Sequence, residues 1–231
     1  DNDFSNLKLT IENWIEKEKQ KHLSDLISIE KTSLKNSLAR GLAYQLFENN
    51  GVLNRETASN MIKNLNKEER YELRKKGIKI GKYHIYQPRM IRPNAIKFKT
   101  ILWKCFNSTK EMSYPNFGIN FLKNFKNKNK NFLRICGFET FGNFIIRVDI
   151  LERLFIEIIN RSKDYKFKLD SKILNLLGCT KDDFVNFIKL NRKKVKNEEN
   201  ETKKKNLTKK IKKNKEKKAT NAFSVLENYK I

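Results

Sequence analysis

Cysteine, histidine and glycine are scarce in this chain of 231 residues, and their scarcity narrows the possible functions. The three cysteines, Cys105, Cys136 and Cys179, stand far apart, with no Cys-x-x-Cys pair and only two histidines to accompany them. Neither a structural zinc site nor a disulfide scaffold is therefore expected. We predict that all three cysteines are reduced, buried and inert.

Long apolar runs are also missing. No stretch approaches the roughly 18 apolar residues that cross a bilayer, and the start of the chain has no signal-peptide pattern. We therefore expect no membrane association and a cytoplasmic location. The first residue is Asp and not Met, so we expect the chain to be a piece of a longer protein.

Catalytic motifs are absent as well. Residues 77–83 resemble a Walker A loop, but only three residues separate the glycines, and Tyr83 stands where Ser or Thr must hold magnesium. Two histidines 62 positions apart leave little room for a histidine-based triad, and the acidic residues Asp149, Glu152 and Glu157 suit a helix cap and surface pairs. The sequence predicts no catalytic residue, no metal site and no cofactor in this chain.

Positive charge is the property that the chain has in excess. It holds 51 basic and 26 acidic side chains, a net charge of +25, which favours a polyanionic partner. Residues 1–70 are balanced at 11 and 11, whereas residues 71–134 hold 16 basic and 2 acidic side chains. The Lys-rich composition that AT-rich genomes favour does not explain this local excess.

Helical spacing dominates the first third of the chain. Apolar residues recur at helical intervals over 11–27 and 34–46, and a third helix with Ala58, Met61 and Ile62 on one face follows Asn54 as its cap. Asn66 and Glu69 have the form of a capping box, and Gly77 stands where a helix C′ glycine belongs. These patterns predict four helices before residue 78.

The pattern then changes to alternation over 78–87, which predicts one strand with a bulge at Gly81. Pro93 is placed to begin a helix, and a basic loop over 108–131 follows. Residues 132–136 and 144–148 are predicted strands around a turn, and Asp149 is the predicted cap of the next helix. Two short helices over 169–190, separated by Gly178, resemble a helix-turn-helix or an ordinary helical hairpin.

These patterns predict an α+β fold that is mostly helical. We expect a helical segment over 1–77, a basic α+β segment over 78–190, a disordered Lys-rich linker over 191–218 that adds affinity without sequence preference, and a terminal peptide motif over 219–231. A short apolar motif at 221–226 after this tether suits a protein partner.

The candidate nucleic-acid site is the 78–87 strand and its flanks. Cations can neutralise phosphates there, while neighbouring aromatic residues such as Tyr83 either stack on bases or belong to the core. With the bulge at Gly81, Lys82 and His84 would lie on the exposed side together with Lys79. The predicted nucleic-acid-binding residues are Lys75, Lys76, Lys79, Lys82, His84, Arg89 and Arg92.

Several segments resemble one protein family, in the same order along the chain. The strongest is residues 74–93, RKKGIKIGKYHIYQPRMIRP, joined by RGLAYQL at 40–46 before GVL at 51–53, and by RVDILERL at 147–154. LGCT at 177–180 and NAFSVL at 221–226 are weaker matches. Together they resemble the region beyond the motor domains of alphaproteobacterial superfamily 2 helicases, relatives of the mitochondrial RNA-degradosome helicase.

This resemblance implies a parent enzyme that uses ATP and magnesium to translocate on nucleic acid with two RecA-like motor domains. No residue of the motor has a matching position in this sequence, so no catalytic role is carried over. The chain would be the accessory C-terminal region, holding RNA or DNA for motor domains present in cis. Phosphate contacts do not distinguish RNA from DNA.

Two alternatives remain open. One is a stand-alone RNA-binding protein, associated with ribosomes. The other is an interaction scaffold, in which the charge-balanced helices of residues 1–70 dock a protein and basicity serves solubility. If those helices pack on motor domains or on another partner, the isolated chain should expose apolar surface.

Overall fold

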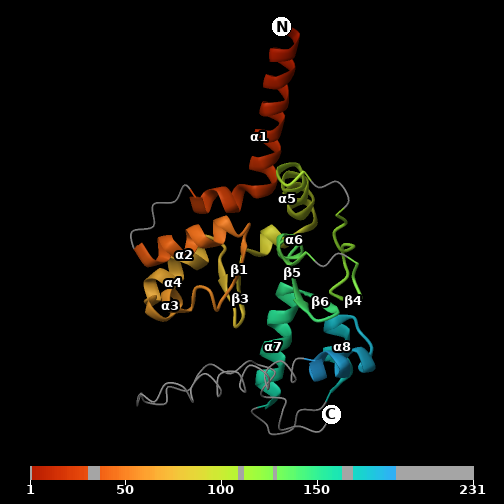
Figure 1. Cartoon of the computed structure of the whole chain (residues 1–231). Coiled ribbons are helices and arrows are strands. Elements are labelled where there is room, and N and C mark those ends of the chain that lie inside the picture. The colour runs from red at the N-terminus through yellow and green to blue at the C-terminus, as the bar shows by residue number, and fades with distance from the viewer. Residues whose placement is uncertain (1, 31–36, 109–111, 127–128, 163–168, 191–231) are drawn as a thin grey trace, which may run out of the picture. The chain divides into compact units, whose positions relative to one another are not determined.

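The computed structural model describes residues 2–30, 37–108, 112–126, 129–162 and 169–190 (Figure 1). It confirms a mostly helical α+β fold, with small three-stranded sheets among the helices. The chain divides into unit 1, residues 1–118 and 126–139, and unit 2, residues 119–125 and 140–231. The boundary predicted at residue 77 lies inside unit 1, and the predicted linker and terminal peptide lie outside the described residues.

Unit 1 begins with helices and contains one small sheet. Its elements are α1 (Asn2–Glu30), α2 (Ser37–Glu48), β1 (Val52–Asn54), α3 (Ser59–Asn64), α4 (Lys67–Lys75), β2 (Lys79–Ile80), β3 (His84–Tyr86), the 3₁₀ turn η1 (Pro88–Ile91), α5 (Pro93–Phe106) and α6 (Lys130–Ile135). The sheet has the order β1-β3-β2, and both pairings are antiparallel. Leu53 and Ile85 bury one face of it against α2, α3 and α4.

Two of the predicted helix ends are confirmed. Asn66 accepts from the backbone N–H of Glu69 while the Glu69 carboxylate accepts from the backbone N–H of Asn66, which is a complete capping box. Gly77 follows α4 with a φ of +73°, in the left-handed region that glycine adopts without strain. The cap predicted at Asn54 is wrong: α3 begins later, and the Asn54 side chain accepts from the backbone N–H of Glu56 in the turn before it.

The single strand predicted over 78–87 is a hairpin. β2 and β3 pair antiparallel with Lys79 opposite Tyr86 and Ile80 opposite Ile85, so no bulge continues one strand through Gly81. The Gly81 backbone N–H donates to the His84 carbonyl at 2.8 Å and closes the turn. The Arg55 guanidinium donates to the Gly81 carbonyl, which holds the turn against the end of β1.

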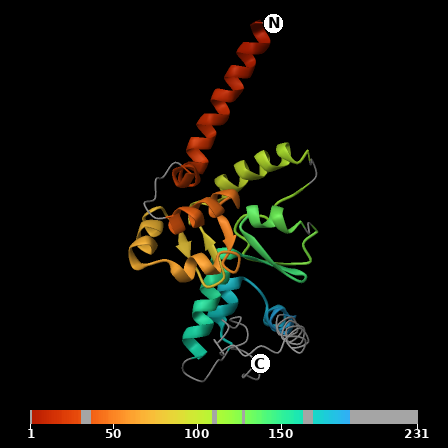
Figure 2. The same ribbon diagram turned by 60° about the vertical axis from the view of Figure 1, so that its left-hand side comes forward.

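Helix α1 changes direction at Leu23, whose φ of −119° and ψ of 17° are not helical. After this bend, Leu23, Leu26 and Ile27 are buried with Met90, Ala95 and Phe98, so that the end of α1 packs on η1 and α5. Before it, residues 3–14 are exposed, and the helix extends away from the other helices of unit 1 (Figures 1 and 2).

Residues 132–136, a predicted strand, belong to helix α6 and its C-cap. The Asn129 side chain accepts from the Phe132 backbone N–H and caps the helix. Trp103 of α5 packs edge-on against Phe132 with 5.1 Å between ring centroids. Cys136 is buried as predicted, Cys179 is half-buried, and Cys105 is exposed, which contradicts the prediction that all three are buried.

Unit 2 contains β4 (Phe121–Lys123), β6 (Phe144–Arg147), α7 (Val148–Ser162) and α8 (Ser171–Leu177), followed by a helical stretch over 181–190. The second sheet has the order β4-β6-β5, and the division between the units falls within β5 (Phe138–Phe141). β6 confirms the strand predicted over 144–148. The core of unit 2 is aromatic, with Phe184 and Phe187 buried beside Phe121 and Phe144.

The helical hairpin predicted at the end of unit 2 is present. Gly178 ends α8 with a φ of +70°, and Thr180 and Asp183 bond each other at the start of the following helix. Asp149 lies in the first turn of α7, where its carboxylate accepts from the Ile150 backbone N–H. Over the described residues, no helix combines the length and the apolar character needed to cross a membrane.

Candidate nucleic-acid interface

The structure separates the predicted site residues into three environments. Lys75 and Lys76 lie at the end of α4, and Lys79 and Lys82 belong to the β2–β3 hairpin. Arg89 lies in η1, and Arg92 follows it. All of these except the half-buried Lys76 are exposed. His84, the seventh predicted residue, lies elsewhere.

His84 is buried, with 2% of its surface exposed, so the prediction that it lies on the exposed side of the strand is wrong. It belongs to β3, the central strand of the sheet, and its Nε2 lies 3.0 Å from the Glu139 carboxylate. Arg134 also approaches this carboxylate, at 3.7 Å. His84 is therefore part of a buried polar cluster, because the predicted bulge that would have turned it outward does not exist.

Lys75 and Lys76 occupy positions at which the structure of unit 1 itself favours a positive charge. The Lys75 ammonium lies 4.6 Å from the centroid of the Tyr71 ring, a cation–π contact one turn back on α4. Both lysines also stand at the C-terminal end of the helix, where positive charge is favoured by the helix dipole. Nucleic-acid binding is therefore not needed to explain these two positions.

Arg89 and Arg92 line a pocket of about 380 Å³ at the beginning of α5. Lys21 and His22 of α1 line it from the other side, together with Ser24 and Asn94. The described residues that line it include no carboxylate. The sequence predicted the two arginines but not Lys21 and His22, because these lie in a charge-balanced segment that only the tertiary fold brings to this place.

Carboxylates just outside the pocket hold three of these cations in position. The Arg89 guanidinium donates to Asp25 at 3.0 Å, and the His22 Nε2 lies 2.9 Å from Glu18. The start of α5 itself has no side-chain cap: Arg92 is the N-cap residue, and no side chain accepts from the first-turn N–H groups in the described structure. Lys21 pairs with Glu18 as well, at 3.5 Å, so Arg92 is the one cation lining this pocket that forms no ion pair among the described residues.

Gln87 connects this pocket to the end of α4. It is fully buried, and its amide nitrogen donates to the carbonyl of Asp25 at 3.2 Å and to that of Lys76 at 3.3 Å. The end of α4 and Arg89 therefore approach the same residue of α1. Lys76 and Arg89 therefore lie near the same part of α1, whereas Lys79 belongs to β2 and Lys82 to the turn between β2 and β3.

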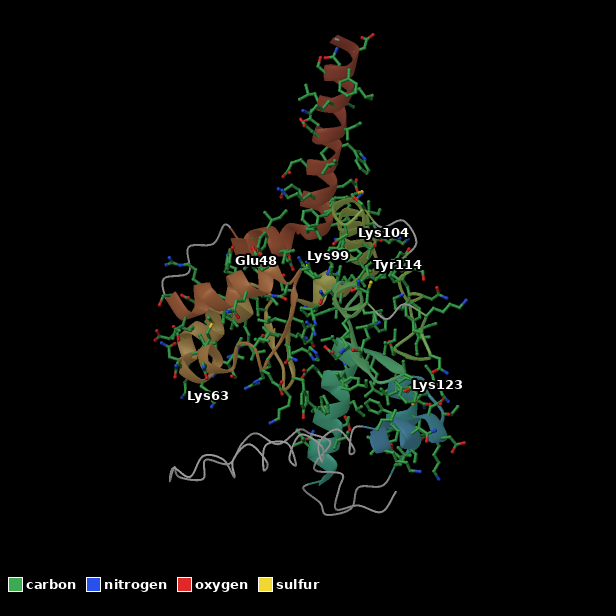
Figure 3. The ribbon with its side chains drawn as sticks, in the orientation of Figure 1. Glu48, Lys63, Lys99, Lys104, Tyr114 and Lys123 are labelled. Atoms are coloured by element: carbon green, nitrogen blue, oxygen red, sulfur yellow. The ribbon has the colours of Figure 1, made fainter. Side chains whose placement is uncertain are left out.

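The loop after α5 is only in part available for binding. In unit 2, Lys123 donates to Asp183 at 2.9 Å, and this bond and that from Thr180 lower the pKa of the Asp183 carboxyl. Lys126 and Lys130 are exposed, and residues 127–128 lie outside the described residues. Figure 3 labels Lys123 in unit 2 and Lys63, Lys99 and Lys104 in unit 1.

Lys99 is the exception among the lysines of unit 1, because it points into the core. Its side chain is buried, its ammonium nitrogen donates to the Asn50 carbonyl at 2.9 Å, and burial lowers its pKa to about 7. Burial raises the pKa of the Cys136 thiol nearby to about 12. Lys99 is therefore a structural residue on the inner face of α5, whereas Lys97 is exposed on the same helix.

The expected apolar surface on the first helix is present. Phe4, Leu7, Ile11 and Trp14 recur at intervals of three and four residues, so they form one stripe along α1, and each is about half exposed or more. Ion pairs within the helix, such as Lys8 with Glu12 at 3.9 Å, accompany the stripe. No packing partner covers this stripe among the described residues.

No known protein family, no curated protein and no solved structure matches this chain. In the described residues, no group of three or more His, Cys, Asp or Glu side chains is arranged to hold a metal ion.

Proposed function

We propose that the chain binds nucleic acid through its phosphates and that the pocket at the start of α5 is the principal folded contact. The observation that carries the proposal is the convergence of Lys21, His22, Arg89 and Arg92 on one opening, whose lining among the described residues holds no carboxylate. A phosphate there would meet cations from two helices and the uncapped first turn of α5.

The charge distribution supports a polyanion over a small anionic metabolite. Between Leu73 and Lys110 the sequence contains no Asp or Glu, so Arg89 and Arg92 of the pocket lie in a stretch of chain without negative side chains. Lys79, Lys82 and Lys97 add exposed cations beyond the pocket. A chain of phosphates is the ligand that makes use of all of them.

On the basis of the sequence resemblance, we further propose that this is the accessory region of an ATP-dependent helicase. Its cations would hold RNA or DNA while motor domains in cis hydrolyse ATP with magnesium. The chain alone is then expected to show no RNA-stimulated ATP hydrolysis in a phosphate-release assay. ATP turnover that persists through purification and depends on this chain would contradict the proposal.

The nucleic-acid proposal is tested by the salt dependence of binding. Fluorescence anisotropy with labelled single-stranded and duplex RNA and DNA gives the slope of log affinity against log salt, which each lost phosphate contact lowers by about 0.7 on a single strand. The double variant Lys21→Gln/Arg92→Gln should lower the slope by about 1.4. These two residues are chosen because Arg89 also holds Asp25, so its removal would affect packing.

A matched control removes the same charge elsewhere in unit 1. Lys63 and Lys67 are exposed at the end of α3 and the start of α4 (Figure 3 labels Lys63), and they do not line the pocket. Lys63→Gln/Lys67→Gln should leave the slope nearly unchanged. If both double variants lower the slope equally, binding follows net charge and the pocket is not the site.

The protein-interaction alternative is favoured by one observation, the exposed stripe on α1. We propose that this stripe packs against the motor domains of the parent helicase, because its flanking charges are balanced and give no attraction for nucleic acid. Trp14, 58% exposed, reports on the contact. With Trp103 replaced by Phe, its emission should shift to shorter wavelength in the parent protein relative to this chain, and an unchanged spectrum would rule the contact out.

A further inference from the structure

The pocket at the start of α5 gathers hydrogen-bond donors from three separate elements. Ser24 lies on α1, Arg89 belongs to η1, and Asn94 belongs to the first turn of α5. Arg92, the N-cap residue of α5, lines the same opening. In the part of the chain that the structure describes, no hydrogen bond or ion pair engages the side chains of Ser24, Arg92 and Asn94. A ligand in the pocket can therefore meet donors from more than one side without breaking an existing contact.

The charges around the pocket do not cancel. Arg89 and Lys21 are each paired with a carboxylate just outside the lining, whereas Arg92 is not. Three permanent cations against two carboxylates leave one excess positive charge, and His22 adds a second when it is protonated. The pocket is therefore suited to a ligand with more than one negative charge.

A nucleic-acid strand contains two kinds of phosphate, and the pocket fits one of them better. An internal phosphodiester has a single negative charge and two free oxygens, because its other two oxygens carry the chain. A phosphomonoester at the end of a strand has about 1.5 to 2 negative charges near pH 7 and three free oxygens. Its charge matches the excess in the pocket, and its three oxygens can accept from α1, η1 and α5 at the same time.

The size and lining of the pocket agree with this choice. Its volume of about 380 Å³ lies within the range of about 300 to 1,000 Å³ that is usual for small-molecule sites. Met90, Pro93 and Ala95 supply an apolar part of the lining, against which the sugar of a terminal nucleotide can pack. A backbone that only crosses a basic surface needs no such concavity, because its phosphates are contacted from one side.

We propose that this pocket recognises the terminal phosphate of a nucleic-acid strand, a phosphomonoester at its 5′ or 3′ end. The inference rests on the proposed function and deepens it, because it names the group that the pocket selects. Arg92 balances the additional negative charge of the monoester, while Ser24 and Asn94 donate to an oxygen that an internal phosphodiester does not offer. An internal phosphate can still enter the pocket, but it makes fewer contacts there.

The test uses the full chain and an internally labelled single strand of 20 nucleotides in three forms: with a 5′ phosphate, with a 3′ phosphate, and with hydroxyl groups at both ends. At least one phosphorylated form should bind about 10-fold more tightly than the hydroxyl form, the lower limit for a hydrogen bond to a charged group. The comparison of the two phosphorylated forms shows which end is selected. A 22-nucleotide strand with hydroxyl ends adds similar charge as internal phosphates, and it should bind within about twofold of the 20-nucleotide hydroxyl form.

Three variants of the pocket test the assignment. Arg92→Gln should remove most of the preference for the phosphorylated strand. Ser24→Ala and Asn94→Ala should each weaken binding of that strand by about 2- to 12-fold, the range for one hydrogen bond, and should leave the salt slope unchanged because no charge is lost. Asn64→Ala is the matched control, since Asn64 is exposed at the end of α3 and does not line the pocket. Ser24, Arg92 and Asn94 are exposed as well, so these replacements remove no core packing, and circular dichroism verifies the fold of each variant.

The outcomes separate this inference from the proposal beneath it. If phosphorylated and hydroxyl strands bind equally while Lys21→Gln/Arg92→Gln lowers the salt slope, the pocket holds internal phosphates, so the inference is wrong and the proposed function stands. A preference for the phosphorylated strand that survives in both Arg92→Gln and Asn94→Ala also overturns the inference, because the strand end is then recognised elsewhere. If the form of the strand has no effect and the double variant leaves the slope unchanged, the proposed function fails as well.

Discussion

The first part of α1 and the helix α5 both expose apolar side chains in unit 1. The charged residues that accompany these side chains differ between the two helices. Along α1, four acidic and four basic side chains alternate between Asp3 and Lys21, and several pair with each other, as Lys19 does with Glu16 at 3.3 Å. Along α5, lysine is the only charged residue. Exposed apolar area alone marks both as interaction surfaces, and the flanking charges indicate different partners.

Net charge therefore misleads when it is taken over the whole chain. The value of +25 describes the molecule as uniformly attractive to polyanions, but α1 contributes none of the excess. A surface with paired charges gives no long-range attraction, since opposite charges a few ångströms apart cancel beyond about one Debye length. The partner of each helix follows from the local balance, and the predictions below separate the two helices on that basis.

The largest effect should come from the face of α5 that α1 covers. Phe98 is buried against Leu23 and Leu26, so Phe98→Ala removes most of a core side chain and should lower the free energy of unfolding by about 3–5 kcal/mol. Phe106→Ala at the exposed end of the same helix should change it by no more than about 0.5 kcal/mol. Urea unfolding of both variants measures the contrast. Similar losses for the two would show that Phe106 is packed and does not await a ligand.

The next largest expected effect is a pH dependence of the free energy of unfolding, caused by Lys99. Its pKa falls from 10.5 in the unfolded chain to about 7 in the fold, so between these values the unfolded chain binds more protons and stability rises with pH. The rise should approach about 1.4 kcal/mol per pH unit between about pH 7.5 and pH 8. Above this range the thiols ionise in the unfolded chain, whereas burial raises the pKa of Cys136 and of Cys179 in the fold, and this difference opposes the rise. Lys99→Met should abolish this slope.

The experiment needs unfolding free energies at pH 7.0, 7.5 and 8.0 for the parent chain and for Lys99→Met. Lys97→Met is the control, since this lysine is exposed on the same helix and its replacement should leave the slope in place. Parallel curves for the parent chain and Lys99→Met would show that Lys99 stays charged in the fold.

Helix ends and buried faces could be predicted from the sequence because their causes are local. The capping box at Asn66 and the left-handed glycines Gly77 and Gly178 follow from residues within one turn, and the structure confirms all three. A reader of the sequence needs no tertiary information to place them. The fold class followed from the same local patterns.

The two wrong strand predictions have equally local causes. The alternation of residues 78–87 continues through Gly81, and Lys82 and Tyr83 are not typical turn residues, so the hairpin turn resembled a bulge. Residues 132–136 are a short apolar run, for which spacing alone does not distinguish strand from helix. The cap at Asn129 was the signal that would have decided it.

Only half of the candidate site could be predicted from the sequence, because the other half is brought to the pocket by the tertiary structure. Arg89 and Arg92 lie in the basic segment and were found by composition. Lys21 and His22 reach the same pocket only because α1 bends at Leu23 and packs on α5. The error on His84 has the same origin, since its burial depends on Glu139, 55 residues away.

A smaller effect should distinguish the two helices by charge. Lys97→Gln on α5 should lower the salt slope for a single strand by about 0.7, which is one phosphate contact. Lys19→Gln on α1 removes the same charge from a side chain that is paired with Glu16, and it should leave the slope unchanged. Anisotropy titrations between 50 and 300 mM salt resolve the difference. Equal slopes for the two variants would mean that Lys19 also contacts phosphate.

The smallest expected effect concerns the apolar stripe of α1. Leu7→Gln/Ile11→Gln alters exposed side chains without changing charge, so the unfolding free energy should stay within about 0.5 kcal/mol of the parent chain. Single-strand affinity should stay within about twofold, because neither residue adjoins the pocket or α5. Self-association at high concentration, measured by sedimentation, should decrease, since the stripe is the apolar surface that is left open in the isolated chain. A variant that loses nucleic-acid binding while remaining folded would place the strand on α1 and remove the contrast between the helices. One that keeps binding, with less self-association, assigns the apolar stripe of α1 to a protein partner and leaves nucleic acid to the pocket and α5.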